Sequence, residues 1–284
     1  MPEPQAILLD GDKLAGRLRG EMKVDAARLI AHGIQPKMAT VLVGDDPASA
    51  SYVARKHADC AEIGIAVEDM RLPATISSDE LLAAIAALNA DPSVHGFMVQ
   101  LPLPAGLDEA AMLEAVRPDK DIDGLHPINL GRLLAGQPGF LPCTPAAILT
   151  LLQAYDIPLA GAEVAIIGRG NLVGRPLAML LSQRGVDATV TLLHSQSRDL
   201  AAATRRADIV ISAAGIPDLV TAEMVKPGAA VVGVGISYVA GVMTSDIAAG
   251  VAQVAGWITP PHGSVGALTR AMLLRNLLRA AAGQ

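Results

Sequence analysis

The stretch "AEVAIIGRGNLVGRPLAMLLSQRGVDATVTLLHSQS", residues 162–197, contains a complete strand–turn–helix–strand pattern. A short apolar run ends at Gly168, a glycine-rich turn and an apolar helical segment follow, and a second β-branched run ends at His194. About 30 residues are enough for a βαβ unit, in which a crossover helix joins two parallel strands. The stretch therefore predicts a parallel sheet and a fold of the α/β class.

The turn in this unit has glycine at positions 168, 170 and 174, one residue longer than the six-residue dinucleotide fingerprint. Glycine lets a backbone approach a pyrophosphate closely, and the N-terminus of the following helix offers free N–H groups and a partial positive charge. The pattern predicts nucleotide binding. The alternative is an ordinary glycine turn between a strand and a helix.

The end of the second strand favours one nucleotide over another. His194, Ser195 and Arg198 follow this strand, and no carboxylate appears before Asp199. An NAD site uses an acidic residue here for the ribose hydroxyls, whereas a cation suits a 2′-phosphate. Arg169, after the first glycine, adds a further positive charge. The sequence thus favours NADP; the alternative is a set of exposed polar residues at a strand end.

The composition favours an α/β fold and small molecules as partners. Hydrophobic residues make up 51% of the 284 residues but aromatic ones only 2%, so the core must consist of Ala, Val, Ile and Leu. The length suggests two domains. A net charge of -6 without a basic stripe argues against nucleic acid or a membrane as partner. Two cysteines, and no basic-then-apolar leader at the start, predict a cytoplasmic protein.

The first half of the chain also alternates strands and helices. The run 36–46 is predicted as a strand, and Asp46-Pro47 as the start of a helix that stops at Gly64. A second helix is predicted in 80–93 and a strand in 94–104. This alternation predicts crossover connections and a second parallel sheet.

Three polar residues of this half are candidates for a site. Tyr52 and Lys56 are four residues apart, so they share one face of the predicted helix, with Ser49 one turn earlier. Gln100 ends the later strand, where open α/β sheets hold their ligands. The alternative interpretation is a snorkelling lysine beside a half-buried tyrosine, and a glutamine that bonds a neighbouring loop.

The segment "DKDIDG", residues 119–124, resembles the opening of a calcium loop but lacks its end. Position twelve of such a loop should be a bidentate Glu, and here it is Leu130. We therefore expect no metal. Asp119 and Asp121 are interpreted as a solvated acidic turn, and Asp123 as the better candidate for a ligand cleft.

Taken together, several segments resemble one family, the bifunctional methylenetetrahydrofolate dehydrogenase/methenyltetrahydrofolate cyclohydrolases, also called FolD. The resemblance covers nearly the whole chain. It rests on "SYVARKHADCAEIGI", "VQLPLP", "PDKDIDGLHPINLGRL", "PCTP", "IIGRGNLVGRP", "ATVTLLHSQS", "ADIVISAAG", "VGVGI" and "ITPPHGSVGALTRAMLLRN", in this order.

The resemblance implies two α/β domains with a cleft between them. These are a folate-binding catalytic domain, 1–123 plus a final helix at about 268–284, and a Rossmann-like NADP-binding domain with a mainly parallel sheet, 124–267. It also implies oxidation of 5,10-methylenetetrahydrofolate with NADP, hydrolysis of the methenyl product to 10-formyltetrahydrofolate, and a homodimer. The implied catalytic residues are Tyr52, Lys56, Gln100 and Asp123, which also bind folate, and the implied NADP contacts are Gly168, Arg169, Gly170, Ser195 and Ile236.

The chain departs from the family pattern in two places. Where P-G-G-V-G-P is common, this chain has "PHGSVGA", with His262, Ser264 and Ala267 as the changed residues. Gly233 also stands where Asp is common. His262 and Gly263 are kept as candidate folate contacts, although a lone loop histidine is more often only solvated.

Two rival functions remain at this point. Another two-domain NADP-dependent dehydrogenase, similar to shikimate dehydrogenase, would explain the glycine turn but not Tyr52, Lys56 and "PDKDIDGLHP" together. A nucleotide-binding protein without catalysis would find its main support in the altered loop near His262.

Overall fold

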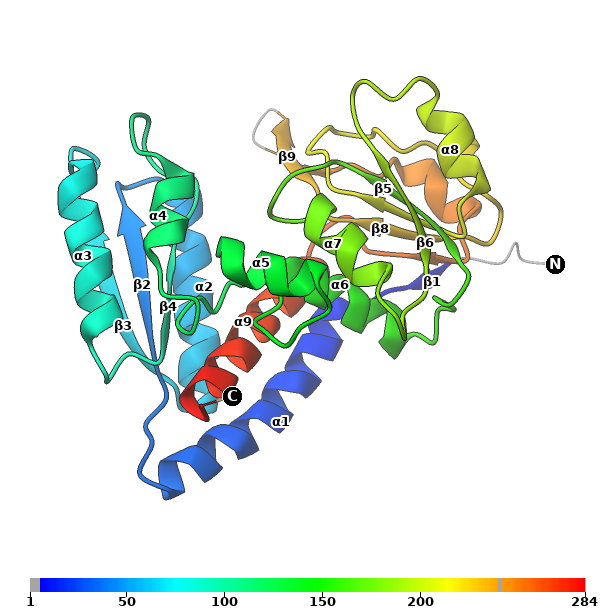
Figure 1. Cartoon of the computed structure of the whole chain (residues 1–284). Helices are drawn as coiled ribbons and strands as arrows, with labels where there is room; N and C mark the ends of the chain where they lie inside the picture. Colours follow the sequence, from blue (N-terminus) through cyan, green and yellow to red (C-terminus); the bar gives the residue numbers. More distant parts are fainter. Residues whose placement is uncertain (1–5, 240–241, 284) are drawn as a thin grey trace. The chain divides into compact units, whose positions relative to one another are not determined.

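The structure of the chain is a computed structural model that describes residues 6–239 and 242–283. It consists of two compact units (Figure 1). The six-stranded unit comprises Met1–Ala15 and Thr144–Thr269, and the three-stranded unit comprises Gly16–Cys143 and Arg270–Gln284. Both unit boundaries near the chain ends fall inside long helices, α1 (Gly11–Ala31) and α9 (Val265–Ala281). The functional domains expected from the sequence use other boundaries, and that division stays a prediction.

The six-stranded unit contains an entirely parallel sheet in the order β1-β11-β8-β7-β5-β6. Its strands are β1 (Ile7–Leu8), β5 (Glu163–Ile167), β6 (Thr189–Leu193), β7 (Ile209–Ser212), β8 (Ala230–Gly233) and β11 (Trp257–Ile258). The inner strands β7 and β5 are almost fully buried, as expected for a parallel sheet covered by helices on both faces. The prediction of two α/β domains with a mainly parallel sheet is confirmed.

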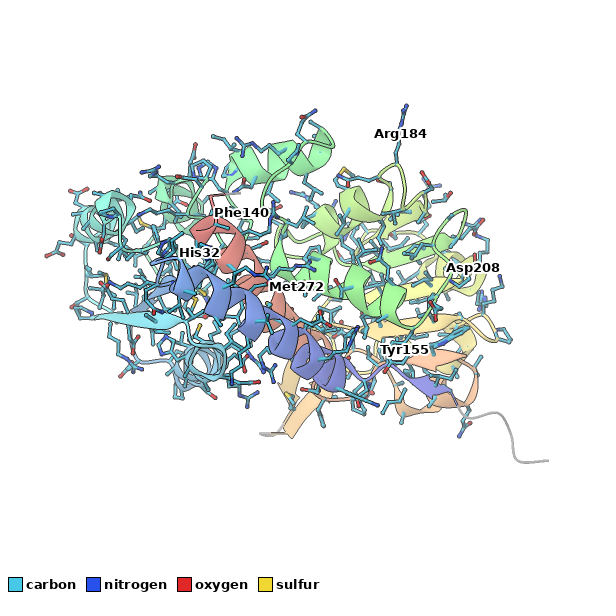
Figure 2. The ribbon with its side chains drawn as sticks, turned by 90° about the horizontal axis from the view of Figure 1, so that it is seen from below. His32, Phe140, Tyr155, Arg184, Asp208 and Met272 are labelled. Carbon is cyan, nitrogen blue, oxygen red and sulfur yellow. The ribbon has the colours of Figure 1, made fainter. Side chains whose placement is uncertain are left out.

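Helices and a hairpin complete this unit. They are α6 (Cys143–Ala154), α7 (Gly174–Leu181), α8 (Leu200–Arg206), the 3-10 helices η1 (Ala222–Met224) and η2 (Ala249–Gln253), and the antiparallel pair β9 (Ile236–Val239) and β10 (Val242–Ser245). Tyr155, labelled in Figure 2, follows α6, and its hydroxyl accepts a hydrogen bond from the Asp10 N–H at 2.7 Å. This bond ties the segment after β1 to the end of α6.

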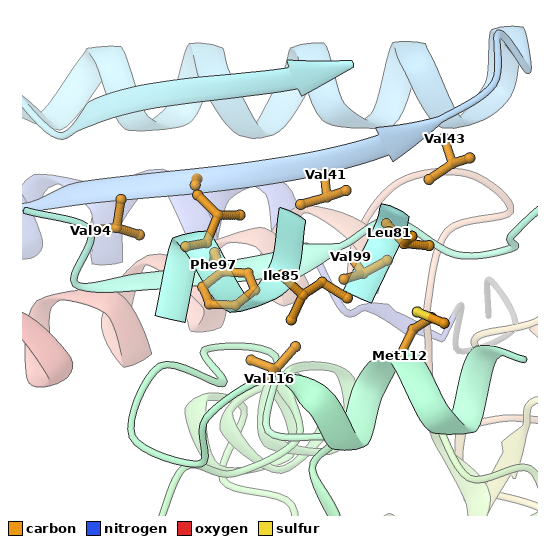
Figure 3. Packing of buried hydrophobic residues seen from close by; sticks show 11 residues of the cluster. Val41, Val43, Leu81, Ile85, Val94, Phe97, Val99, Met112 and Val116 are labelled. Carbon is orange, nitrogen blue, oxygen red and sulfur yellow. The ribbon is translucent and has the colours of Figure 1, made fainter. Parts of the chain in front are cut away.

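The three-stranded unit is built on a parallel sheet in the order β3-β2-β4. Its elements are β2 (Lys37–Val43), α2 (Pro47–Ile63), β3 (Ala66–Leu72), α3 (Ser78–Ala90), β4 (Gly96–Val99), α4 (Glu109–Ala115) and α5 (Pro127–Leu134). Phe97 and Val99 of β4 pack with Leu81 and Ile85 of α3 and Met112 of α4 (Figure 3). Residues two apart on a strand share a face, so Met98 and Gln100 project to the other side.

The helix predicted at Pro47 is present with both of its ends. The Asp46 side chain caps it by accepting a hydrogen bond from the Ser49 N–H at 2.8 Å, and Pro47 occupies the first turn. Gly64 ends it in the left-handed conformation, with φ of 84°, which glycine adopts without a Cβ clash. The cap at Asp46 and the end at Gly64 therefore determine where α2 begins and ends, and with it where Tyr52 and Lys56 lie.

Several elements are not predicted by the sequence, and β3 and α1 are among them. The strand β3 was missed because it lies at the edge of its sheet, and Glu68, Asp69 and Arg71 break its apolar pattern. The helix α1 was also not predicted. Within the described ranges, no helix is both long enough and apolar enough to cross a lipid bilayer.

Candidate active site

A buried amine lies at the centre of the candidate site. Lys56, on α2, is only 4% exposed, so its side chain does not reach bulk water as a snorkelling lysine would. Its Nζ lies 4.8 Å from the centroid of the Tyr52 ring, one turn earlier on the same helix. The expected pairing of these two side chains on one helix face is thus present in the structure.

Gln100 approaches the same amine from the sheet. Its Oε1 accepts a hydrogen bond from Lys56 Nζ at 3.1 Å, and its Nε2 donates to the Leu101 carbonyl at 2.6 Å. The Gln100 N–H donates to Val41 of β2, which fixes the residue directly after β4. The Met98 sulfur, two residues earlier, lies 2.8 Å from the same Nζ. We call Tyr52, Lys56, Met98 and Gln100 the lysine cluster.

Burial governs the protonation of this cluster. Burial lowers the pKa of Lys56, and the nearby Asp123 carboxylate opposes this by raising it. Burial raises the pKa of Tyr52 to about 12, so its phenol is neutral over the working range of an enzyme. Burial likewise raises the pKa of the Cys143 thiol well above its usual value. The cluster therefore holds an amine whose charged form is destabilised and neutral neighbours that do not titrate near pH 7.

Asp123 lies within a turn whose shape is held by a second aspartate, Asp121. The Asp121 carboxylate accepts hydrogen bonds from the N–H groups of Gly124, Leu125 and His126 and from Asn129 Nδ2. Asp121 is only 4% exposed, so the expectation of a solvated turn at this position was wrong. Asp119 is exposed and pairs with Arg117, as a solvated residue would.

A residue near the end of the chain fastens the same turn. Asn276 of α9 donates from Nδ2 to the carbonyls of Ile122 at 2.9 Å and Leu141 at 3.0 Å. Gly124 has φ of +73°, and a Cβ there would lie 2.4 Å from the Leu141 carbonyl carbon. The backbone at Gly124 and the backbone at Leu141 are therefore in close contact, next to Asp123. Sequence reasoning missed Asn276 because its partners are more than 130 residues away.

The glycine turn has the shape that a nucleotide site needs. A Cβ on Gly168 would lie 2.4 Å from the Ala213 carbonyl oxygen, and one on Gly174 would lie 1.9 Å from the Gly168 carbonyl oxygen, so the chain itself requires these two glycines. Around Gly170, by contrast, no described atom lies within 4 Å of such a Cβ. No described side chain caps the first turn of α7, in which the Arg175 N–H donates to the Gly170 carbonyl and Pro176 has no N–H.

The remaining predicted nucleotide contacts lie around this turn. The Gly168 N–H donates to the carbonyl of Leu193, the last residue of β6, which brings the glycine turn to the strand end that precedes Ser195. Arg169 and Ser195 are both exposed. Ile236 begins β9, and its side chain lies outside the described residues. That these residues contact NADP stays a prediction.

Asp246 is a further residue of this region that sequence reasoning did not identify. It is fully buried, and its Oδ2 accepts hydrogen bonds from Ser212 Oγ and from the N–H groups of Ala214 and Gly215. Ser212 ends β7, and Ala214 and Gly215 follow it beside Gly168. Asp246 therefore fixes the backbone at the end of β7, next to the glycine turn.

The loop that departs from the family pattern has a defined shape. Ser264 has φ of +60°, a conformation in which glycine is favoured, and it is fully buried. Its Oγ donates to the Leu9 carbonyl, and its N–H donates to Asp12 Oδ2. His262 and Gly263 are exposed on this loop. At Gly233, a Cβ would lie 2.9 Å from both Ser245 and Ile247, so the residues packed here leave no room for an aspartate.

The lysine cluster is distinguished by its chemistry and not by the size of a cavity. A cavity of about 490 Å³ in the three-stranded unit is lined by Pro92 and His95, which precede β4, and by Lys120. Gln100, which follows the end of β4, does not line it. Among residues 6–239 and 242–283, no group of three His, Cys, Asp or Glu side chains is placed to hold a metal ion.

Comparison with known families and structures gives a consistent picture. Residues 9–123 match the family described as tetrahydrofolate dehydrogenase/cyclohydrolase, catalytic domain, and residues 142–284 match its NAD(P)-binding domain. The bifunctional methylenetetrahydrofolate dehydrogenase/cyclohydrolase FolD from Campylobacter jejuni is 43% identical, with a TM-score of 0.95 over 98% of this chain and 99% of that chain.

A second structure, the Trypanosoma brucei dehydrogenase-cyclohydrolase complexed with NADP and an inhibitor, is 36% identical. Its TM-score is 0.93 over 99% of this chain and 98% of that one. A shikimate dehydrogenase is similar only in fold, at 13% identity and a TM-score of 0.53 over 87% of this chain and 95% of that one. Two matched domains and relatives above 30% identity over nearly the full length lead to one conclusion: this chain belongs to the tetrahydrofolate dehydrogenase/cyclohydrolase family.

Proposed function

We propose that the lysine cluster carries the folate chemistry of a bifunctional enzyme. The enzyme oxidises 5,10-methylenetetrahydrofolate to 5,10-methenyltetrahydrofolate with NADP and then hydrolyses this product to 10-formyltetrahydrofolate. The observation that carries the proposal is the buried amine of Lys56, which is 4% exposed and lies against the Gln100 amide and the Tyr52 ring.

The oxidation step makes modest demands on the protein. A hydride leaves the methylene carbon, and the resulting cation is delocalised over two nitrogens, so no strong base is required. NADP, when bound, supplies the hydride acceptor. The contribution of the protein is to orient the two reactants and keep them in place. In our proposal, the ring of Tyr52 provides a flat wall for the folate, and Asp123 holds the pterin.

The hydrolysis step needs proton transfer. Water adds to the methenyl carbon, loses a proton, and a ring nitrogen takes up a proton as its bond to that carbon breaks. A free lysine with a pKa of about 10.4 is neutral only about once in 2,500 molecules at pH 7. Burial lowers the pKa of Lys56 and increases that fraction. We propose that Lys56 is the group that moves this proton.

Gln100 suits this role because it is an amide. Its Oε1 accepts a hydrogen bond from the amine and orients it. A carboxylate at the same place would stabilise the ammonium and keep the lysine protonated. The hydrogen bond from Gln100 Nε2 to Leu101 sets the amide so that its oxygen, and not its nitrogen, faces the lysine.

On the nucleotide side, we propose that Gly168, Arg169, Gly170, Ser195 and Ile236 contact NADP, and that His262 and Gly263 contact the folate. The open space at Gly170 supports the close approach of a pyrophosphate there. The exposed Arg169 and Ser195 support recognition of the 2′-phosphate.

An absorbance assay tests the function directly. The rate of NADP reduction is measured with and without methylenetetrahydrofolate, and the disappearance of methenyltetrahydrofolate is followed without NADP. The proposal predicts folate-dependent reduction and separate hydrolysis. NADP reduction with shikimate but not with the folate would favour the rival dehydrogenase, and folate binding without either reaction would favour a non-catalytic protein.

We also propose that the chain is a homodimer in the cytoplasm, without nucleic acid or membrane partners. The family resemblance and the net charge of -6 support this. The strand β6 lies at one edge of the six-stranded sheet and is a candidate for pairing across a two-fold axis. Light scattering should give twice the 29.2 kDa mass of one chain; a mass of one chain at micromolar concentration would contradict the dimer.

A further inference from the structure

The lysine cluster contains a sulfur atom that no role yet explains. Met98, the third residue of β4, is 3% exposed, and its Sδ lies 2.8 Å from Lys56 Nζ. It shares a sheet face with Gln100, because the two residues are two apart, while Phe97 and Val99 pack into the cluster around α3 and α4. Met98 and Gln100 therefore reach the amine side by side.

The neighbours of the amine are unusual for a buried cation. An ammonium has three protons to donate, and the groups in contact with it are the Gln100 oxygen, the Met98 sulfur and the face of the Tyr52 ring. All three are uncharged. A thioether sulfur is a weak acceptor, whereas the branched alkyl group of a leucine accepts nothing.

Charged and titratable groups act on the amine from several elements. The Asp123 carboxylate favours the ammonium, whereas the Arg270 guanidinium disfavours it. Cys143 and Cys60 would favour it only as thiolates, and burial raises the pKa of both thiols. The Arg270 guanidinium is itself held by Asp59, at 2.6 Å. Because these effects oppose one another, the groups in direct contact with the amine also influence how readily it is protonated.

We propose that Met98 is a positioning residue for Lys56: its sulfur accepts a hydrogen bond from the amine, directs it alongside Gln100 and stabilises its protonated form. This inference rests on the proposed function of Lys56. The predicted direction of the change is the same whether the protonated or the neutral lysine acts in hydrolysis. Without the sulfur the ammonium loses an acceptor, so the pH at which Lys56 titrates must fall.

The test is a direct titration of Lys56 in the intact protein. The chain has six lysines, so ¹³C NMR of protein labelled at the lysine ε-carbon gives six resonances, and the K56M variant identifies that of Lys56. In M98L, which nearly conserves volume, the Lys56 pKa should fall by about half a unit, as loss of one weak hydrogen bond implies. In M98Q, whose amide oxygen is a stronger acceptor, it should rise.

M112L is the matched control. Met112 is 1% exposed and belongs to the cluster on the opposite face of the sheet, so its replacement should leave the Lys56 titration unchanged. The acidic limb of the pH profile for hydrolysis should move with the NMR value in M98L. An unchanged or higher pKa in M98L, or an equal fall in M112L, would overturn the inference. Retained hydrolysis in K56M would instead overturn the proposed function, so the two failures are distinguishable.

Discussion

The amine of Lys56 lies 4.8 Å from the centroid of the Tyr52 ring, and both side chains belong to the same face of α2. A cation over an aromatic face gains about 0.5–2 kcal/mol, more when water is excluded. The ring therefore does two things at once: it borders the amine and offers a flat apolar surface to a substrate ring. The hydroxyl group is not needed for either.

This relationship predicts different outcomes for two replacements of Tyr52. Y52F keeps the ring, so folate KM and kcat should stay within about threefold of the parent. Y52L removes it and should reduce kcat/KM by roughly tenfold or more, the equivalent of about 1.4 kcal/mol. Steady-state kinetics of both reactions provide the measurement. A Y52F variant as impaired as Y52L would show that the hydroxyl, and not the ring, matters.

The burial of Lys56 predicts a gain in stability when it is removed. Its folded pKa is lowered, so between that pKa and the unfolded value of about 10.4 the unfolded chain binds more protons. Stability then rises with pH through this window, which means that the buried lysine destabilises the fold at neutral pH. K56M should therefore have a higher Tm than the parent at pH 7, by a few degrees, since 1 kcal/mol corresponds to about 2–4 °C in a domain of this size.

The difference in Tm between K56M and the parent should shrink as the pH approaches 10. Differential scanning calorimetry at pH 7 and pH 9.5 gives the comparison, with the exposed Lys23→Met as a control that should show no gain. A lower Tm for K56M at pH 7 would mean that the amine stabilises its surroundings.

The bridge made by Asn276 predicts a coupled loss of stability and folate binding. N276A leaves the carbonyls of Ile122 and Leu141 without this donor, and one such buried group costs about 1–3 kcal/mol. Because the bridge sets the segment that presents Asp123, folate KM should rise while the Kd for NADP stays unchanged.

Asn89 offers a matched control for Asn276. It also joins two backbone segments of the same unit, through the Ala115 carbonyl and the Arg117 N–H, without contact to Asp123. N89A should lose stability but keep the parent KM. A double-mutant cycle with D123N should show that the kinetic effect of N276A disappears when the carboxylate is gone; fully additive effects would leave Asn276 as a structural residue only.

The glycine turn predicts a separation of folding from nucleotide binding. Gly170 has open space around its Cβ position, so G170A should keep the Tm of the parent yet lose about tenfold or more in NADP affinity. G168A should lose both, because its φ of 112° is strained for alanine and the Ala213 oxygen lies 2.4 Å from the new Cβ. Calorimetric titration with NADP distinguishes them. Parent-like binding by G170A would exclude close approach of the cofactor at this residue.

Local signals in the sequence predict much of this molecule. The Asp46 cap, Pro47 and Gly64 determine both ends of α2, and the four-residue spacing of Tyr52 and Lys56 then places them on one face. The strand β2 and the βαβ unit around Gly168 follow from apolar runs bounded by turn residues. In each case the information lies within one or two elements.

What escaped prediction depends on contacts that form only in the folded chain. Asp121 looked like a solvated residue because its three backbone donors become available only when the turn closes. Asn276 and Asp246 act on carbonyl or N–H groups that the sequence does not place near them. Met98 could have been found, since its two-residue spacing from Gln100 puts both on one face of β4.

The most direct test of the account is the rate at which K56M hydrolyses methenyltetrahydrofolate, measured together with its Kd for NADP. The account predicts that hydrolysis falls to the uncatalysed rate while NADP binds as it does to the parent, because the glycine turn is untouched. Hydrolysis by K56M at a rate near that of the parent would contradict the central claim that the buried amine performs this chemistry.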